Sequence, residues 1–245
     1  MSEPKAKFAP LYREPAYLKV YRAIEQNIVE GGLSDGEALP IEAALCEQFQ
    51  VTRSTVREGL RLLEQSGLIV RGSHKKFIVR RPNASDVAAA ASRSLALGGV
   101  TFSEVWETLA IYYPQAARLA ATRLDDESLA ALNTVWRALG ENADEDHDKT
   151  VACAVEFFQS LAKGLNNRVM LAMLQSLNMM IGESLRQVIG RAPSARTRIL
   201  NAQKNILDAF YARDEDLAEE WMAKHIADLK RGYVVAKVEM DQPIL

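Results

Sequence analysis

The fold of the N-terminal part of the chain is decided by residues 51–64, VTRSTVREGLRLLE. One face of this segment is apolar at helical spacing, and the opposite face carries an arginine at every fourth position. The apolar residues are Val56, Leu60 and Leu63, and the arginines are Arg53, Arg57 and Arg61. Thr52 is placed to cap such a helix, because its hydroxyl can accept a hydrogen bond from the amide of Ser54 or Thr55. The segment therefore predicts a helix that packs by one face and presents cations on the other.

Two further helices are predicted before this segment, and a hairpin after it. Residues 17–29 have apolar side chains spaced three to four apart, and Pro40 suits the first position of a second helix. Residues 68–71 and 76–79 are predicted as two strands joined by a basic tip. A helix, a helix-turn-helix and a hairpin in this order predict a winged helix-turn-helix, which is a small α+β fold.

Basic residues gather in this part of the chain, although the whole protein has a net charge of −2. Residues 1–82 contain 13 Lys and Arg against 10 Asp and Glu, and residues 50–81 contain eight against two. A local cationic patch on an acidic protein is typical of a module that binds phosphates. A solvated charged face would have the same composition, so charge alone does not decide between the two.

The remainder of the chain is predicted to be helical. Residues 81–85, RPNAS, interrupt the pattern and predict a linker. They divide the chain into residues 1–82, which contain the winged helix-turn-helix, and an all-helical domain, residues 83–245. The family resemblances given below imply DNA binding for the first domain, and effector binding and dimerisation for the second. About seven helices are expected in the second domain, in an antiparallel bundle. Their predicted ranges are 86–97, 102–123, 127–139, 151–164, 168–189, 195–213 and 216–235.

Membrane and enzyme functions are not predicted. The longest unbroken apolar run, residues 169–174, is too short for a membrane span, and the N-terminus has no apolar core of the signal-peptide kind. We therefore expect a cytoplasmic, nucleoid-associated protein with no membrane partner. None of the three histidines, His74, His147 and His225, lies in a recognisable nucleophile or metal motif, and we predict no catalytic residue.

The N-terminal motifs resemble the signature of the GntR family of bacterial transcription regulators. They are LPIE at 39–42, VTRSTVREGL at 51–60, LE at 63–64 and GL at 67–68, and the resemblance spans residues 17–80. It implies that the third helix contacts the major groove and flanking phosphates, and that the hairpin tip enters the adjacent minor groove. The residues implied in DNA contact are Thr52, Arg53, Ser54, Thr55 and Arg57 on the helix, and Ser73, His74 and Lys75 at the tip. Arginine chemistry agrees with this placement, because a guanidinium can donate two hydrogen bonds to guanine O6 and N7.

Two positions depart from the family pattern and leave the operator sequence open. The position after Glu42, often an arginine in the family, is Ala43, and the hairpin has His74-Lys75 where a second glycine is usual. A short recognition helix needs two half-sites, so we expect a homodimer on double-stranded DNA with two-fold symmetry. A winged helix used only for protein contacts is the alternative.

Residues 86–235 resemble the FCD ligand-binding domain of FadR-type members of that family. The resemblance rests on EVWE at 104–107, PQAARLAA at 114–121, Asn167, residues 209–214 and His225. Many such domains hold a divalent metal with one Asp and three His, and bind a small carboxylate on it.

That metal site does not carry over residue by residue. The family's Asp falls on Ala154, two of its His fall on Phe158 and Gln203, and only His225 matches. An arginine that often binds the effector carboxylate falls on Leu109. Since alanine and phenylalanine offer no lone pair, we predict neither a metal nor any other cofactor in this bundle.

A small-molecule effector is still expected at the same positions. The predicted effector-binding residues are Leu109, Tyr113, Ala154, Phe158, Gln203 and His225. Because the surroundings are apolar and aromatic, a hydrophobic or amphipathic effector such as a fatty acyl thioester is favoured. Two alternatives stay open: Tyr112 in the place of Tyr113, and a repacked core without ligand, which would leave a constitutive or partner-controlled regulator.

Overall fold

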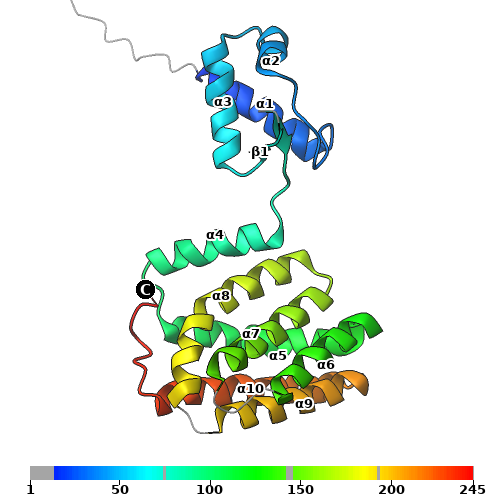
Figure 1. The fold of residues 1–245 in the computed structure, drawn as a ribbon, viewed down its shortest axis with the longest axis vertical. Helices are drawn as coiled ribbons and strands as arrows, with labels where there is room; N and C mark the ends of the chain where they lie inside the picture. Colours follow the sequence, from blue (N-terminus) through cyan, green and yellow to red (C-terminus); the bar gives the residue numbers. More distant parts are fainter. Residues whose placement is uncertain (1–13, 74–75, 142–145, 192–193, 245) are drawn as a thin grey trace, which may run out of the picture. The chain divides into compact units, whose positions relative to one another are not determined.

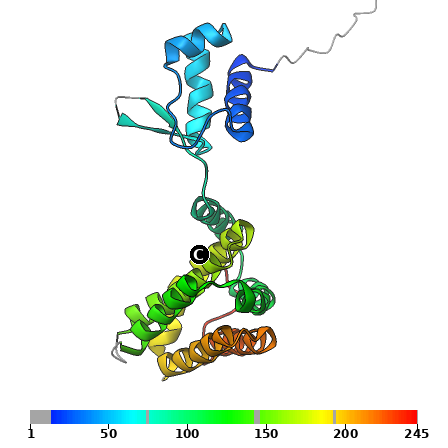
Figure 2. The same cartoon turned by 90° about the vertical axis from the view of Figure 1, so that its right-hand side faces the viewer.

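The computed structural model describes residues 14–73, 76–141, 146–191 and 194–244. They divide into two compact units, one ending at Pro82 and the other beginning at Asn83. The first unit consists of helices and a hairpin, and the second is a bundle of helices (Figures 1 and 2).

The first unit is the predicted winged helix-turn-helix. Its elements are α1 (Ala16–Glu30), α2 (Glu42–Phe49), α3 (Arg53–Gln65), β1 (Ile69–Arg71) and β2 (Phe77–Val79). The two strands pair antiparallel, with Ile69 opposite Val79. The hairpin follows α3 directly, as the sequence predicts.

The apolar face of α3 packs against α1 and forms the core of this unit. Val56 and Leu63 on α3 are fully buried, and Val20 and Ile24 on α1 are buried with them. Gly59 lies at the crossing, where a Cβ would be 2.9 Å from Val20 Cγ1. The two helices therefore approach as closely as they do because residue 59 has no side chain.

The prediction that Pro40 begins the second helix is wrong. The helix begins at Glu42, and Ile41 before it is extended, with φ −63° and ψ 154°. The reason is that the segment before the helix pairs with β2. The Leu39 amide donates to Phe77 O at 2.8 Å, and Ala38 forms a bridge with Ile78. Backbone pairing with the hairpin holds this segment extended and delays the start of the helix.

The second unit contains seven described helices, which confirms the all-helical prediction. They are α4 (Ala84–Leu97), α5 (Phe102–Arg123), α6 (Asp126–Glu141), α7 (His147–Gly164), α8 (Arg168–Arg191), α9 (Ala195–Tyr211) and α10 (Glu215–Val235).

Capping side chains explain two helix starts that lie earlier than predicted. The Asn83 side chain accepts from the backbone amide of Asp86, and the backbone amide of Asn83 donates to the Asp86 carboxylate. Because of this cap, α4 begins inside the predicted linker. Asp146 accepts from the Lys149 amide and begins α7 four residues before the predicted start. Both caps satisfy amides that lack a partner within the helix.

In the bundle, α10 packs against α5 and α9, α4 against α8, and α7 against α6 and α8. Large buried side chains fill the interior, among them Trp106, Phe157 and Tyr233. The C-terminal segment returns to the junction of α4 and α5, where the Ile244 amide donates to Val100 O at 3.0 Å. None of the described helices is long and apolar enough to cross a membrane.

Candidate DNA-reading surface and effector site

Hydroxyl groups gather at the start of α3. Thr52 Oγ1 accepts from the Thr55 amide at 3.4 Å, which is one of the two caps that the sequence predicts. The same oxygen lies 3.0 Å from Ser54 Oγ and 2.9 Å from Thr55 Oγ1. Polar hydroxyls at a helix N-terminus are suited to phosphate oxygens, because free amides and the helix dipole favour an anion there.

Two arginine side chains project from the first turns of α3. The side chains of Arg53 and Arg57 are 74% and 67% exposed, respectively. A single carboxylate on α2 holds both: Arg53 Nε donates to Glu42 Oε2 at 2.9 Å, and Arg57 Nε donates to Glu42 Oε1 at 3.2 Å. Each guanidinium is thus held through its Nε, and these contacts leave its terminal nitrogens available for other acceptors.

Glu42 contacts two of the predicted DNA-contact residues, and sequence reasoning assigned it no role. Its hydrogen bond from Arg53, together with the charges of Arg57 and Arg53, lowers the pKa of its carboxyl, so the group stays ionised. The position was visible in the motif LPIE, but the motif does not say which side chains the carboxylate meets. That information depends on how α2 crosses α3.

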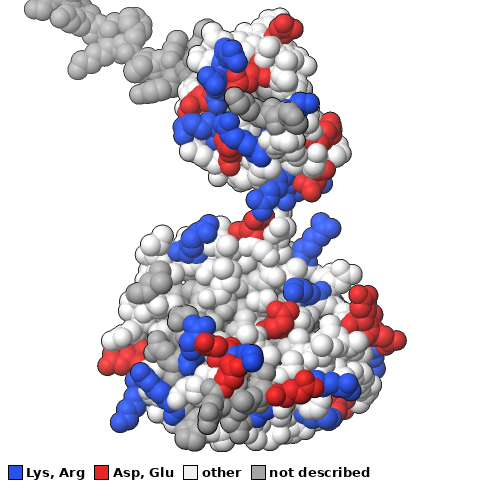
Figure 3. Space-filling model, viewed as in Figure 1, with Lys and Arg blue, Asp and Glu red and all other residues white. Residues whose placement is uncertain are grey.

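The other basic residues near α3 are paired differently. Arg61, the third of the predicted row, donates to Glu58 on its own helix. Arg71 on β1 donates to Glu64 Oε1 at 3.1 Å and lies over the Phe77 ring, 5.1 Å from its centroid. On the face of this unit drawn in Figure 3, Lys and Arg side chains lie among acidic ones.

Five of the eight predicted DNA-contact residues lie together on and just before the first turns of α3: Thr52, Arg53, Ser54, Thr55 and Arg57. Ser73 is exposed two residues after the end of β1, and the Gly72 amide before it donates to Lys76 O at 2.8 Å. His74 and Lys75 lie outside the described residues. Ala43, the departure from the family pattern, is exposed on α2.

The six predicted effector residues are all buried in the second unit. They come from α5, α7, α9 and α10, and none is more than 1% exposed. Three rings form a continuous contact: the Tyr113 and Phe158 centroids are 4.5 Å apart, and those of Phe158 and His225 are 5.5 Å apart. Leu109 and Ala154 lie one turn before Tyr113 and Phe158 on the same helices, and Gln203 is buried on α9.

Several polar atoms in this core have no hydrogen-bond partner among the described residues. They are Gln203 Oε1 and Nε2, His225 Nε2 and Asn178 Nδ2. The third of these residues, Asn178 on α8, accepts from Tyr113 Oη at 2.5 Å and was not predicted from the sequence. Its role depends on a contact between residues 65 positions apart. Buried unpartnered polar atoms are costly, so each one requires a reason.

Burial lowers the pKa of His225 to about 4, so its imidazole is neutral at pH 7. Burial also raises the pKa of Tyr113, so its hydroxyl stays protonated. Among the described residues, no group of three or more His, Cys, Asp or Glu could hold a metal ion. One imidazole and one amide are the only donors at the four carried-over positions, which is too few for the metal that the family resemblance implies.

Comparisons with known proteins agree with both parts of this structure. Residues 16–79 match the model of the gntR family of bacterial regulatory proteins, and residues 104–228 match that of the FCD domain. The transcriptional repressor NanR of Salmonella typhimurium is 29% identical over 231 residues, covering 89% of this chain and 84% of that protein. NanR of Salmonella arizonae is similar to the same extent.

A solved structure shares the fold. The GntR protein of Streptococcus agalactiae has a TM-score of 0.67 and 22% sequence identity, covering 88% of this chain and 99% of that one. The match to the gntR family model and the similarity to the NanR repressors identify a DNA-binding transcription regulator and not an enzyme. The chain belongs to the GntR family of bacterial regulatory proteins and carries an FCD domain in its second unit.

Proposed function

We propose that this regulator binds a two-fold symmetric DNA operator as a homodimer, and that an effector in the helical bundle changes its affinity for that operator. The proposed setting is the bacterial cytoplasm. The proposed base-reading residues are Arg53 and Arg57, with Thr52, Ser54 and Thr55 on flanking phosphates and Ser73, His74 and Lys75 at the hairpin tip.

The observation that carries the proposal is the arrangement of the two guanidinium groups. Arg53 and Arg57 are one helical turn apart, exposed, and fixed by the same Glu42 carboxylate. A recognition helix places its N-terminal residues against base edges, and two fixed guanidinium groups there can each pair with a guanine.

The DNA-reading part is tested on an operator selected by the full-length protein from a random library. Changing Arg53 or Arg57 to Ala should cost roughly 1–3 kcal/mol on that operator and much less on random duplex DNA. Arg22→Ala is the matched control, since Arg22 is exposed on α1 and paired with Glu14. Lys75→Ala should weaken binding to both DNAs alike. Equal losses on both DNAs for R53A and R57A would demote these residues to phosphate contacts.

The effector part is supported by the polar atoms in the buried core. Gln203 and His225 are buried and carry donors and acceptors that have no partner among the described residues. The His225 ring stacks on Phe158, which in turn contacts Tyr113. Such a site suits a mostly apolar molecule that carries one polar group, of which a fatty acyl thioester is an example. The ligand-binding role and the six residues assigned to it are part of this proposal.

The alternative is a bundle whose centre takes no ligand, and the close contact of the Tyr113, Phe158 and His225 rings favours it. A thermal-shift series with long-chain acyl thioesters separates the two. On the effector proposal, the melting temperature rises and operator affinity changes, since a ligand moves an equilibrium only by binding one state better. Stabilisation that is equal in the parent and in Gln203→Leu would place the ligand elsewhere.

A further inference from the structure

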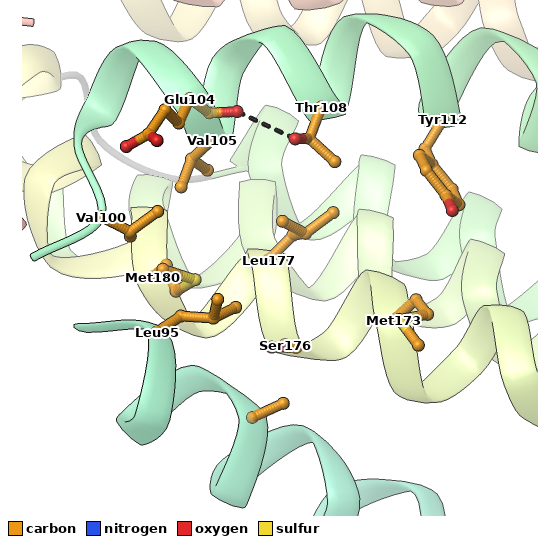
Figure 4. A pocket seen from close by; sticks show the side chains of 11 residues that line it. Leu95, Val100, Glu104, Val105, Thr108, Tyr112, Met173, Ser176, Leu177 and Met180 are labelled. Carbon is orange, nitrogen blue, oxygen red and sulfur yellow. Dashed lines mark hydrogen bonds between the residues drawn. The ribbon is translucent and has the colours of Figure 1, made fainter. Parts of the chain in front are cut away.

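Two hollows of the structure differ in the chemistry of their linings. The pocket between α4, α5 and α8 is lined mainly by apolar side chains, and Tyr112 and Met173 at one end of it are partly exposed (Figure 4). Such a lining accepts many apolar molecules alike and defines no particular ligand. The groove beside α3 in the first unit has a volume of about 420 Å³ and is lined mainly by charged side chains. Its charges can therefore be set against those of DNA phosphates.

Acidic and basic side chains are equal in number in this groove. The charged residues that line it are Glu42, Arg57, Glu58, Arg61, Glu64 and Arg71. Three carboxylates thus face three guanidinium groups, and the formal charge of the lining is zero. Net positive charge is what attracts DNA of any sequence, because binding to phosphates releases the cations condensed on the duplex. The groove as a whole does not provide that attraction.

Arg61 is held by a carboxylate on its own helix. Its Nε donates to Glu58 Oε1 and Oε2 at 3.2 and 3.1 Å, and its Nη2 donates to Glu58 Oε1 at 2.6 Å. These hydrogen bonds lower the pKa of the Glu58 carboxyl, so the group is ionised at neutral pH. A phosphate that approached this guanidinium would meet the negative charge of Glu58 beside it.

Arg71 is held by two partners. Its Nε donates to Glu64 Oε1 at 3.1 Å, and its guanidinium lies over the Phe77 ring, 5.1 Å from the centroid. Glu64 is in the last turn of α3 and Arg71 is the last residue of β1, so the pair connects the helix to the hairpin. Both partners hold the guanidinium against the surface of this unit.

The pairing of these two arginines differs from that of Arg53 and Arg57. Arg53 and Arg57 share the single carboxylate of Glu42, so this group of three keeps one positive charge in excess. Arg61 and Arg71 each have a carboxylate of their own. The excess positive charge of these seven side chains therefore lies at the first turns of α3, the part of a recognition helix that reads base edges.

From these observations we propose that Glu58 and Glu64 are specificity-determining residues of this regulator. They neutralise Arg61 and Arg71, which weakens binding to DNA of arbitrary sequence and leaves the first turns of α3 as the cationic part of the surface. The inference rests on the proposed DNA-reading role of α3 and adds to it a role for two residues that read no base.

The test measures binding of the full-length protein to random duplex DNA and to its selected operator by fluorescence anisotropy, between about 50 and 200 mM salt. Glu58→Gln and Glu64→Gln should each raise the affinity for random DNA by about three- to tenfold at the lowest salt. Each should also steepen the slope of log affinity against log salt by up to about 0.9, the value for one added phosphate contact. Operator affinity should rise less, because base contacts fix α3 there and a released arginine cannot select its phosphate. Glu47→Gln is the matched control, since Glu47 is exposed on α2 and does not line the groove.

A double-mutant cycle separates the release of an arginine from the loss of one negative charge. Arg61→Gln alone should weaken binding to random DNA no more than Arg22→Gln does, because a neutralised Arg61 makes no phosphate contact in the parent. When Arg61 is already Gln, Glu58→Gln should have no more effect than Glu47→Gln, because no arginine is left to release.

Three results would overturn the proposal. E58Q and E64Q could act no more strongly than E47Q, or E58Q could act equally with and without Arg61, which would reduce both residues to general surface charge. R61Q could lose as much affinity as R53A, which would make Arg61 a DNA contact in the parent. In these two cases the proposed DNA-reading role of α3 stands. The third result, a parent protein that binds neither DNA, would overturn that role as well.

Discussion

The imidazole of His225 lies nearly parallel to the ring of Phe158, with their centroids 5.5 Å apart and 14° between their planes. Both positions are ones at which the family resemblance implies metal-binding histidines. In a family member with histidines at both positions, the two side chains would bind the same metal ion. In this chain they stack as two rings. Among the described residues, these two positions are held together by ring packing and burial.

The first prediction is that divalent metals do not stabilise this protein. Metal that binds only the folded state raises the melting temperature by linkage, but Ala154, Phe158 and Gln203 cannot replace the missing ligands. Added zinc, nickel or manganese should leave the melting temperature unchanged. Elemental analysis of protein purified without an affinity tag should find well under one equivalent. Stoichiometric metal that is lost in His225→Ala would contradict this prediction.

The second prediction concerns pH. The pKa of His225 is about 4 in the folded protein, against about 6.5 in the unfolded chain, so the unfolded state binds the additional proton between these values. Stability from this residue is complete above pH 6.5 and is lost as the pH falls toward 4, by roughly 2–3 kcal/mol. Urea unfolding at pH 7.5 and 4.5 should show a smaller loss for His225→Phe than for the parent. Identical losses would show that His225 does not titrate in this way.

The third prediction tests the contact of α1 with α3. Gly59→Ala places a Cβ 2.9 Å from Val20 Cγ1 and 3.1 Å from Tyr17 O. Overpacking of this kind should lower the free energy of unfolding by about 1–3 kcal/mol. Gly140→Ala is the control, because its nearest neighbour is Leu200 Cδ1 at 3.6 Å, an ordinary contact. That substitution should be neutral or stabilise α6 by up to about 1 kcal/mol. Similar destabilisation by both would remove the steric explanation.

The fourth prediction concerns Glu42. Changing it to Ala releases Arg53 and Arg57 from a shared partner and removes a negative charge from the proposed DNA surface. Affinity for random DNA should rise while preference for the selected operator falls by about tenfold, since phosphates attract any cation but base edges require fixed geometry. Fluorescence anisotropy with both DNAs over a salt series measures the two effects. If both affinities changed in parallel, Glu42 would have no part in positioning the arginines.

The sequence was sufficient for those features that depend on local pattern. The cationic side of α3, the Thr52 cap and the hairpin after Gly67 follow from spacing and capping chemistry within a few residues. The start of α2 did not follow, because Leu39 pairs with Phe77, 38 positions away, and that pairing decides where the helix can begin.

For the candidate sites too, the sequence predicts some features and not others. Burial of Tyr113, Phe158 and His225 could be inferred from helical periodicity and family resemblance. The buried polar atoms of Asn178 and Ser176 that have no partner among the described residues could not. In the sequence, Asn178 and Ser176 are two polar residues in a methionine-rich stretch, and nothing in that stretch indicates how the surrounding helices bury them. Whether a buried amide or hydroxyl has a partner depends on the packing of α5 and α4 against α8, and no spacing rule contains this information.

The shared carboxylate of Glu42 has an evolutionary consequence. Since one side chain fixes two guanidinium groups, positions 42, 53 and 57 form a single unit of variation. A relative that acquires a different operator cannot readily exchange one arginine alone. The Glu42 carboxylate would then keep its hydrogen bond from the remaining arginine and lose the other one. Substitutions at these three positions should therefore occur together across related regulators, and intermediates with only one exchange should be rare.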